Sequence, residues 1–130
     1  GIPKINDVLF TTEAPLGNVC RIPNIFGKFC VGQRLITMQP VNGLVTSEFL
    51  EYVLLSKEFK DEMWKKSSGS TVKGIRSKEL AKLTIPVPQI ELQNDFAAFV
   101  EQVEKQKAVM QQSLEKMETN YKALMQGYFG

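Results

Sequence analysis

The sequence predicts an α+β fold, in which a small antiparallel or mixed sheet domain with a packed helix is followed by one long C-terminal coiled-coil helix. The prediction comes from a change of composition along the chain. Residues 1–88 hold all six prolines and most of the glycines, whereas residues 89–126 contain neither and are rich in Gln, Glu, Lys and Met. A turn-rich segment is typical of a compact domain, and a long stretch without helix breakers favours a single helix.

Short apolar runs between turn residues predict the strands of the first part. We expect strands over residues 7–12, 18–22 and 29–39. The segment Ala14-Pro15-Leu16-Gly17 predicts a turn between the first two strands, because Pro presets φ and Gly can adopt a positive φ. Short strands joined by tight turns indicate an antiparallel or mixed sheet.

Apolar residues at helical spacing follow the strands. Ser47 is the expected N-cap of an amphipathic helix over residues 48–65. The expected buried face of that helix is formed by Phe49, Tyr52, Val53, Phe59 and Met63. Ser77 is expected to cap a short helix over residues 78–82. The prolines of Thr84–Pro88 predict an extended segment there.

One helical pattern runs from Ile90 to about Phe129, which at ~1.5 Å per residue spans about 60 Å. Its apolar residues recur at the spacings of a coiled-coil seam, which is interrupted and changes spacing at Gln106-Lys107. A looser packing layer is expected at that point. A helix of this length cannot bury its seam against a domain of 88 residues, so it needs a partner helix in another chain or elsewhere in this one.

Composition restricts the classes of function. The chain has 130 residues and a net charge of +2, which allows one domain with a modest core and a local basic patch. No apolar run approaches the roughly 20 residues that span a bilayer, and no signal peptide is visible, so we expect a cytoplasmic protein without membrane contacts. The absence of His excludes Ser-His-Asp and Cys-His catalysis and zinc ligand sets that contain His. We expect no catalytic residue, no bound metal and no cofactor.

The two cysteines give a separate expectation. Cys20 and Cys30 are ten residues apart and have no CxxC spacing. Free cysteine is usually buried or half-buried, and structural disulfides are rare in the cytosol. We therefore expect two buried or half-buried thiols.

Three stretches together resemble the specificity subunit of Type I restriction–modification enzymes. Asp7–Gly17 is similar to the strand and turn of that family, with the residues DVLF followed by AP and G. Gly69–Ile75 with the leucines that follow is the second stretch. Ile85–Gln93 is similar to the segment that opens the conserved long helix. The order and spacing of all three before a long helix carry the resemblance.

The resemblance implies a role in DNA recognition. A full subunit of the family has two target recognition domains, which read the two parts of a bipartite site, and two long helices that pack antiparallel as a spacer. Modification subunits methylate adenine, and restriction subunits translocate and cleave DNA, so S-adenosylmethionine, Mg²⁺ and ATP are expected only on those partners. Residues 1–88 would be a recognition domain that lacks the N-terminal strands usual in the family, and residues 89–130 the spacer or dimerisation helix.

The loop over residues 65–76 is the candidate DNA contact. Its basic side chains suit phosphates, its hydroxyls suit phosphates and base edges, and its two glycines let the backbone approach closely. The expected DNA-binding residues are Lys65, Lys66, Ser68, Ser70, Thr71, Lys73 and Arg76 of the loop, together with Arg34. A solvated surface loop is the alternative, and the resemblance favours DNA contact.

Other residues leave alternatives open. Arg21 and Lys28 could face DNA, although each alone is more typical of an ordinary exposed charge. Trp64 and Phe26 could stack on a flipped base, although packing in a core or a helix–sheet joint is favoured. Glu13 could accept a hydrogen bond from N4 of cytosine.

The sequence therefore predicts a non-catalytic, sequence-specific DNA recognition subunit or half-subunit that positions methyltransferase and restriction subunits on a bipartite site. A coiled-coil protein–protein adaptor without DNA binding is the alternative. The expected partners are double-stranded DNA, modification subunits, restriction subunits and a second copy of the chain. The homodimer would form antiparallel, with Gln106–Met110 near the twofold axis, through Phe96, Phe99, Val103, Met110, Leu114, Met117, Tyr121, Leu124 and Tyr128.

Overall fold

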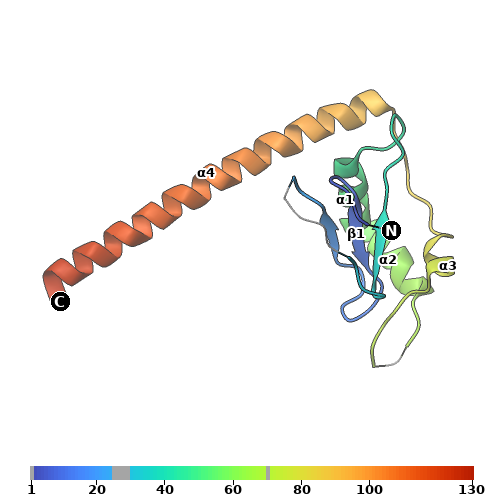
Figure 1. The fold of residues 1–130 in the computed structure, drawn as a ribbon, viewed down its shortest axis with the longest axis horizontal. Coiled ribbons are helices and arrows are strands. Elements are labelled where there is room, and N and C mark those ends of the chain that lie inside the picture. The colour runs from blue at the N-terminus through green and yellow to red at the C-terminus, as the bar shows by residue number, and fades with distance from the viewer. Residues whose placement is uncertain (1, 25–29, 70) are drawn as a thin grey trace. The chain divides into compact units, whose positions relative to one another are not determined.

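A computed structural model describes residues 2–24, 30–69 and 71–130. Its elements, in chain order, are β1 (Val8–Thr11), β2 (Val19–Arg21), β3 (Leu35–Met38), α1 (Ser47–Leu55), α2 (Lys57–Lys66), α3 (Ser77–Leu80) and α4 (Ile90–Phe129) (Figure 1). The expected α+β fold with a long C-terminal helix is confirmed. The chain divides into two compact units, Gly1–Ala97 and Ala98–Gly130, so the first turns of α4 belong to the first unit.

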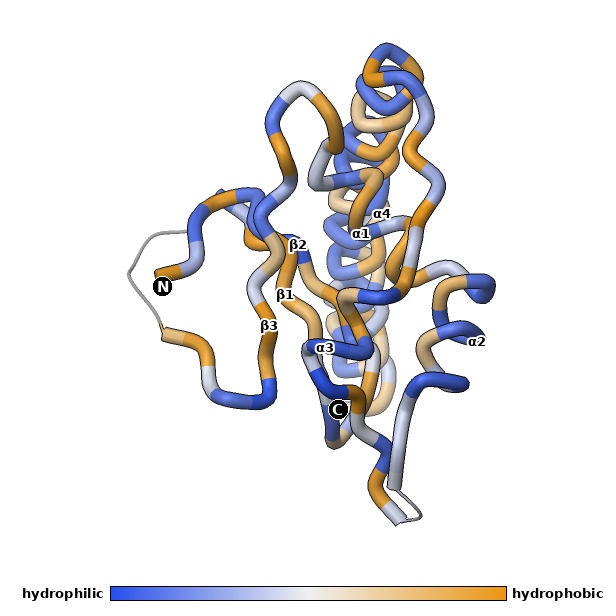
Figure 2. Tube along the Cα trace, turned by 90° about the vertical axis from the view of Figure 1, so that its right-hand side faces the viewer, coloured by the Kyte–Doolittle hydropathy of each residue, from blue (hydrophilic) through white to orange (hydrophobic). Residues whose placement is uncertain are grey.

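The sheet has three antiparallel strands in the order β2-β1-β3. Phe10 of β1 lies opposite Val19 and Ile36, and the side chains of Val8 and Phe10 are fully buried. Figure 2 shows β1 as a hydrophobic segment of this sheet. The third strand is shorter than expected, because a turn closed by a hydrogen bond from the N–H of Leu35 to the carbonyl of Gly32 (3.1 Å) precedes it. Residues 25–29 lie outside the described part of the chain.

The turn between β1 and β2 forms as expected, with a glycine of positive φ. Gly17 has a φ of +87°, and a Cβ atom on it would lie 2.8 Å from Cε of Met63. The backbone conformation therefore favours glycine here, and a side chain at this position would also displace the end of Met63. The Ala14–Pro15 peptide bond in this turn is cis.

The single helix expected over residues 48–65 is wrong, because the chain forms two helices that meet at Ser56. The backbone of Ser56 is extended, its N–H donates to the carbonyl of Val53, and its hydroxyl accepts from the N–H of Phe59 at 3.3 Å. Ser56 therefore ends α1 and caps α2, a role for which serine is well suited.

The expected caps of α1 and α3 are also wrong by one residue. Thr46 caps α1 by accepting from the N–H of Phe49 at 3.2 Å, while Ser47 is the buried first residue of the helix. Ser77 is likewise the first residue of α3, whose N-cap is Arg76.

The core of the first unit lies between the sheet and the two helices α1 and α2. Phe10 meets Phe59 edge to face, with ring centroids 6.5 Å apart. The buried cluster consists of Val8, Phe10, Leu50, Leu54, Phe59, Met63 and Ile75. Two of the residues expected on the buried face of α1, Phe49 and Tyr52, instead contact Phe96 of α4, at centroid distances of 6.5 and 5.1 Å. Phe96, expected in a seam between two chains, thus packs within its own unit.

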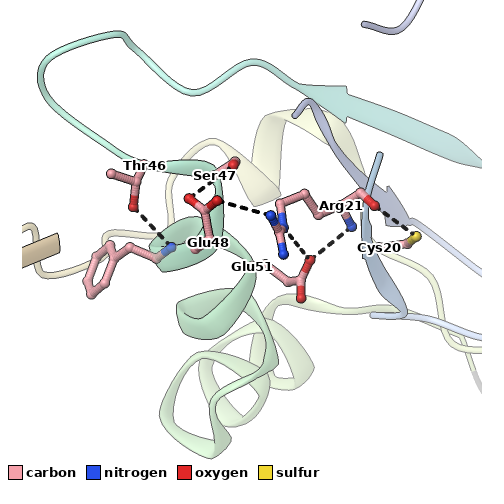
Figure 3. A network of polar contacts seen from close by, with 7 residues as sticks. Cys20, Arg21, Thr46, Ser47, Glu48 and Glu51 are labelled. Atoms are coloured by element: carbon pink, nitrogen blue, oxygen red, sulfur yellow. Dashed lines mark hydrogen bonds and ion pairs between the residues drawn. The ribbon is translucent and has the colours of Figure 1, made fainter. Parts of the chain in front are cut away.

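Arg21 joins β2 to α1 (Figure 3). Its guanidinium lies 3.0 Å from Glu48 and 3.5 Å from Glu51, and its backbone N–H donates to Glu51 at 3.0 Å. The side chain of Arg21 is only 18% exposed. Both sequence-based interpretations of Arg21, a DNA contact and an ordinary exposed charge, give way to a structural ion-pair network.

Cys20 and Cys30 are free thiols, and both are exposed, so the expectation of burial is wrong. Side chains alternate across a strand, and Val19 and Arg21 point towards the protein. Cys20 between them therefore points to solvent.

Candidate nucleic-acid interface

The candidate interface lies at the end of the sheet where β1 ends and β3 begins. The N–H of Thr12 and its hydroxyl both donate to the carbonyl of Arg34, at 2.9 and 3.1 Å. Glu13 follows, and its carboxylate lies 3.2 Å from Nε of Arg34. Arg34 is therefore held beside the residues that follow β1 by both its backbone and its side chain.

The basic loop over residues 65–76 is attached to the same end of the sheet. The N–H of Ile75 donates to the carbonyl of Thr12 at 3.0 Å, and the Ile75 side chain is buried in the core. Ser68 and Gly74 exchange two backbone hydrogen bonds of 2.9 and 3.0 Å, which close the loop at its base. A Cβ atom on Gly74 would lie 3.4 Å from both Glu13 and Thr12, so the loop and the strand approach closely here.

An open pocket of about 470 Å³ lies between the loop and the end of the sheet. Its polar lining includes the residues Thr12, Glu13, Gln33, Ser68, Arg76 and Ser77. The pocket therefore combines hydroxyl, amide and guanidinium groups that can bond phosphates or base edges.

Trp64, at the end of α2, contacts the loop. The ammonium of Lys73 lies 5.6 Å from the centroid of the Trp64 ring, within the range of a cation–π interaction. Trp64 is 54% exposed, so the expectation that it packs in a core is wrong. The buried face of α2 carries Phe59 and Met63, and Trp64, one position after Met63, is turned outward. Phe26 and Lys28 lie outside the described residues.

The cations at the end of α2 differ in their surroundings. Lys65 lies 2.9 Å from Glu62, whose hydrogen bond raises the pKa of the lysine. The pKa of Glu79 in α3 is lowered, first by its hydrogen bond with Lys82 and also by the charges of Lys66 and Arg76. Within residues 2–24, 30–69 and 71–130, Lys66 and Arg76 form no ion pair, so both are available to an anion.

Comparison with protein families decides the identity of the domain. The model of the family described as Type I restriction modification DNA specificity domain matches residues 2–119. The chain belongs to this family. The resemblance inferred from three short stretches of sequence is thereby confirmed, and the match extends through the first unit and far into α4.

The structure places the expected DNA-binding residues of this specificity domain as follows. Ser68 and Arg76 line the pocket, Arg34 lies beside it on Glu13, and Lys73 rests on Trp64. Lys65 and Lys66 occupy the last turn of α2, Thr71 is exposed, and Ser70 lies outside the described residues. Gln33 and Thr12 also line the pocket, although neither was among the expected residues. Their proximity to the loop depends on contacts between distant parts of the chain.

The second unit of the specificity domain is the remainder of α4. Hydrophobic positions recur along α4 (Figure 2). In the unit Ala98–Gly130 the exposed large apolar residues are Phe99, Val109, Met110, Leu114, Met117, Tyr121, Leu124, Met125, Tyr128 and Phe129. Isolated helices are marginally stable in water, and large exposed apolar surfaces mark interaction sites. This stripe is therefore a candidate partner surface.

The described residues contain neither a metal-binding cluster nor a membrane-spanning helix. No group of three or more His, Cys, Asp or Glu side chains among them could hold a metal ion. None of the helices described has the length and apolar character needed to cross a membrane.

Proposed function

We propose that this chain is a sequence-specific DNA recognition component of a Type I restriction–modification enzyme, and that it contacts duplex DNA with the loop over residues 65–76 and the adjacent end of the sheet. The observation that carries the proposal is the attachment of the loop through the Ile75–Thr12 and Ser68–Gly74 hydrogen bonds. This attachment fixes the base of the loop, with its basic side chains, to the end of the sheet. Contacts to phosphates position a protein on DNA, and rigid presentation is what base reading requires.

Two kinds of contact are supported by the surroundings of the cations. Lys66 and Arg76 form no ion pair in the described part of the chain, which suits contacts to phosphate. Arg34 is 70% exposed and is oriented by Glu13 through Nε, which leaves its two terminal nitrogens to donate to O6 and N7 of guanine. We propose that Arg34 reads a base and that Glu13 positions it.

The loop is tested by replacing Lys66, Lys73 and Arg76 together with Ala in the enzyme assembled with its modification subunits. We expect weaker DNA binding. The slope of the logarithm of the binding constant against the logarithm of salt concentration should fall in magnitude by roughly one for each phosphate that the variant no longer neutralises. The matched control removes three cations away from the loop, Lys4, Lys57 and Lys60, all exposed. If the loop variant keeps the affinity and the salt slope of the control, the loop is only a solvated surface.

We also propose that the chain has no catalytic activity of its own and that it positions methyltransferase and restriction subunits, which hold S-adenosylmethionine, Mg²⁺ and ATP. The lack of histidine supports this proposal, because the common hydrolytic triads cannot be assembled. Purified chain should show no DNA methylation, nuclease or ATPase activity when the cofactors are added. Methyl transfer by the chain alone would contradict the proposal.

For α4 we propose pairing with a second copy of the chain, because the exposed apolar stripe needs a helical partner of similar length. Light scattering at micromolar concentration should report about 29 kDa, twice the 14.7 kDa of one chain. Replacing Val103, Met110 and Leu114 with Glu should give monomers or insoluble protein. A well-behaved monomer of the unmutated chain would contradict this pairing.

A further inference from the structure

A β-turn directly before β3 carries two exposed polar residues side by side. The N–H of Leu35 donates to the carbonyl of Gly32 at 3.1 Å, so Gln33 and Arg34 are the two central residues of the turn. Both are exposed. The N–H and the hydroxyl of Thr12 both donate to the carbonyl of Arg34, which ties the turn to the residue after β1. The turn therefore holds both residues at a fixed place at the end of the sheet.

Gln33 faces the basic loop across the open pocket of about 470 Å³, which it lines together with Ser68 and Arg76. Among the described residues, none is hydrogen-bonded to the side-chain amide of Gln33. A glutamine amide has two N–H donors and one acceptor oxygen. Both kinds of group are therefore available to a ligand at this site.

The donor and the acceptor of a glutamine amide match one base edge of the major groove. Adenine presents the N7 acceptor and the N6 amino donor there, and Gln can bond both at once. Guanine presents two acceptors, which suit the two terminal nitrogens that Glu13 leaves to Arg34. A phosphate offers only acceptor oxygens, so it would use only the donors of the Gln33 amide. The amide is therefore better matched to a base than to the DNA backbone.

We infer that Gln33 reads an adenine in the base pair next to the one that Arg34 reads. This inference rests on the proposed contact of this end of the sheet with DNA and adds a second base to it. The Cα atoms of consecutive residues are about 3.8 Å apart, close to the ~3.4 Å step between stacked base pairs. Consecutive residues of one fixed turn therefore match consecutive base pairs. The site recognised by this chain contains adenine and guanine in neighbouring base pairs.

Selection of binding sites from DNA duplexes of randomised sequence tests this inference in the enzyme assembled with its modification subunits. Gln33→Ala should lose a preference for adenine at one position, by roughly 5- to 150-fold, the discrimination that one bidentate pair provides. Arg34→Ala should lose a preference for guanine at the neighbouring position. The matched control is Gln39→Ala, which should keep every preference, because Gln39 is exposed at the opposite end of β3.

Gln33→Glu separates base reading from a merely structural role of this side chain. A carboxylate accepts hydrogen bonds but cannot donate them, so this variant should replace the preference for adenine with one for cytosine, whose N4 amino group donates. Damage to the turn would not create a new preference. Loss of the adenine preference without a new one would therefore overturn the inference.

The inference and the proposed DNA contact fail on different results. If Gln33→Ala relaxes no position, or any position other than an adenine beside the one that Arg34→Ala relaxes, the inference is wrong. The DNA contact is judged by the triple variant of Lys66, Lys73 and Arg76. It stands if that variant loses affinity and salt slope, and it fails if the variant behaves as its control.

Discussion

Replacing Gln93 with Leu should strongly destabilise the unit Gly1–Ala97, although the two side chains are similar in size. Gln93, in the first turn of α4, is only 1% exposed. Its amide nitrogen donates to the carbonyls of Leu44 and Pro88, and its Oε1 accepts from the N–H of Thr46, all at 2.9 Å. Thr46 caps α1, so this one side chain holds the start of α4 to the start of α1.

The size of the effect follows from the three backbone groups whose hydrogen-bond partner is removed. A buried polar group left unpaired costs about 1–3 kcal/mol. The carbonyl of Leu44 can partly regain water, since Leu44 is 56% exposed. We therefore expect the free energy of unfolding to fall by about 2–4 kcal/mol, less than the simple sum of three such penalties. Such a decrease is large against the roughly 5–15 kcal/mol that stabilises a typical domain.

Urea denaturation followed by tryptophan fluorescence measures this decrease. The chain contains a single tryptophan, Trp64 in α2, so the fluorescence reports on the unit that contains Gln93. The matched control is Asn94→Leu, in which an exposed amide of the same helical turn is replaced and a change within about 0.5 kcal/mol is expected. If Gln93→Leu is no less stable than Asn94→Leu, the three hydrogen bonds do not hold the unit together and the reasoning is refuted.

Three further predictions concern the sheet and the loop. Arg21→Met should lower the free energy of unfolding, measured by urea denaturation, by about 1–3 kcal/mol, because it removes a largely buried ion-pair network. Arg34→Met removes an exposed ion pair and should lower it by less than about 1 kcal/mol. Equal decreases in the two variants would argue against the network. Gly69→Ala should weaken DNA binding by about tenfold, because a φ of +113° and a clash of the new Cβ with the carbonyl oxygen of Val72 strain the loop by about 1–3 kcal/mol. In the control Gly32→Ala, the new Cβ has no atom within 4 Å, and DNA binding should be unchanged. A similar loss of affinity in both variants would show that strain at Gly69 is not the cause. Trp64→Leu should reduce DNA affinity about two- to fivefold, because it removes the contact of the Lys73 ammonium with the ring, which is worth about 0.5–1 kcal/mol. Trp64→Phe keeps an aromatic ring and should retain part of that affinity. Titration of fluorescently labelled DNA measures these affinities, and equal effects of Leu and Phe would exclude a role for the aromatic ring.

The features that the sequence alone determined are those that depend on neighbours close along the chain. The absence of Gly and Pro over residues 89–126 was sufficient to predict α4, and Pro15 and Gly17 were sufficient to predict the turn between the first strands. The cations of the loop could be named from composition, because the chemistry of phosphate contact depends on residue type. The family could be inferred from the order of three short stretches, and the match over residues 2–119 confirms it.

The tertiary structure decided every feature that depends on contacts between distant residues. Gln93 forms a hydrogen bond with Thr46 across 47 positions, and Ile75 with Thr12 across an even longer separation in sequence, so no local pattern marks either pair. Phe49 and Tyr52 lie at helical spacing, but the buried apolar residues of α1 are Leu50, Val53 and Leu54. The rings of Phe49 and Tyr52 contact Phe96 of α4 instead. Helical periodicity predicts which residues share a face of a helix. Only the packed fold decides what that face meets, because burial is the sum of contacts from every element of the unit.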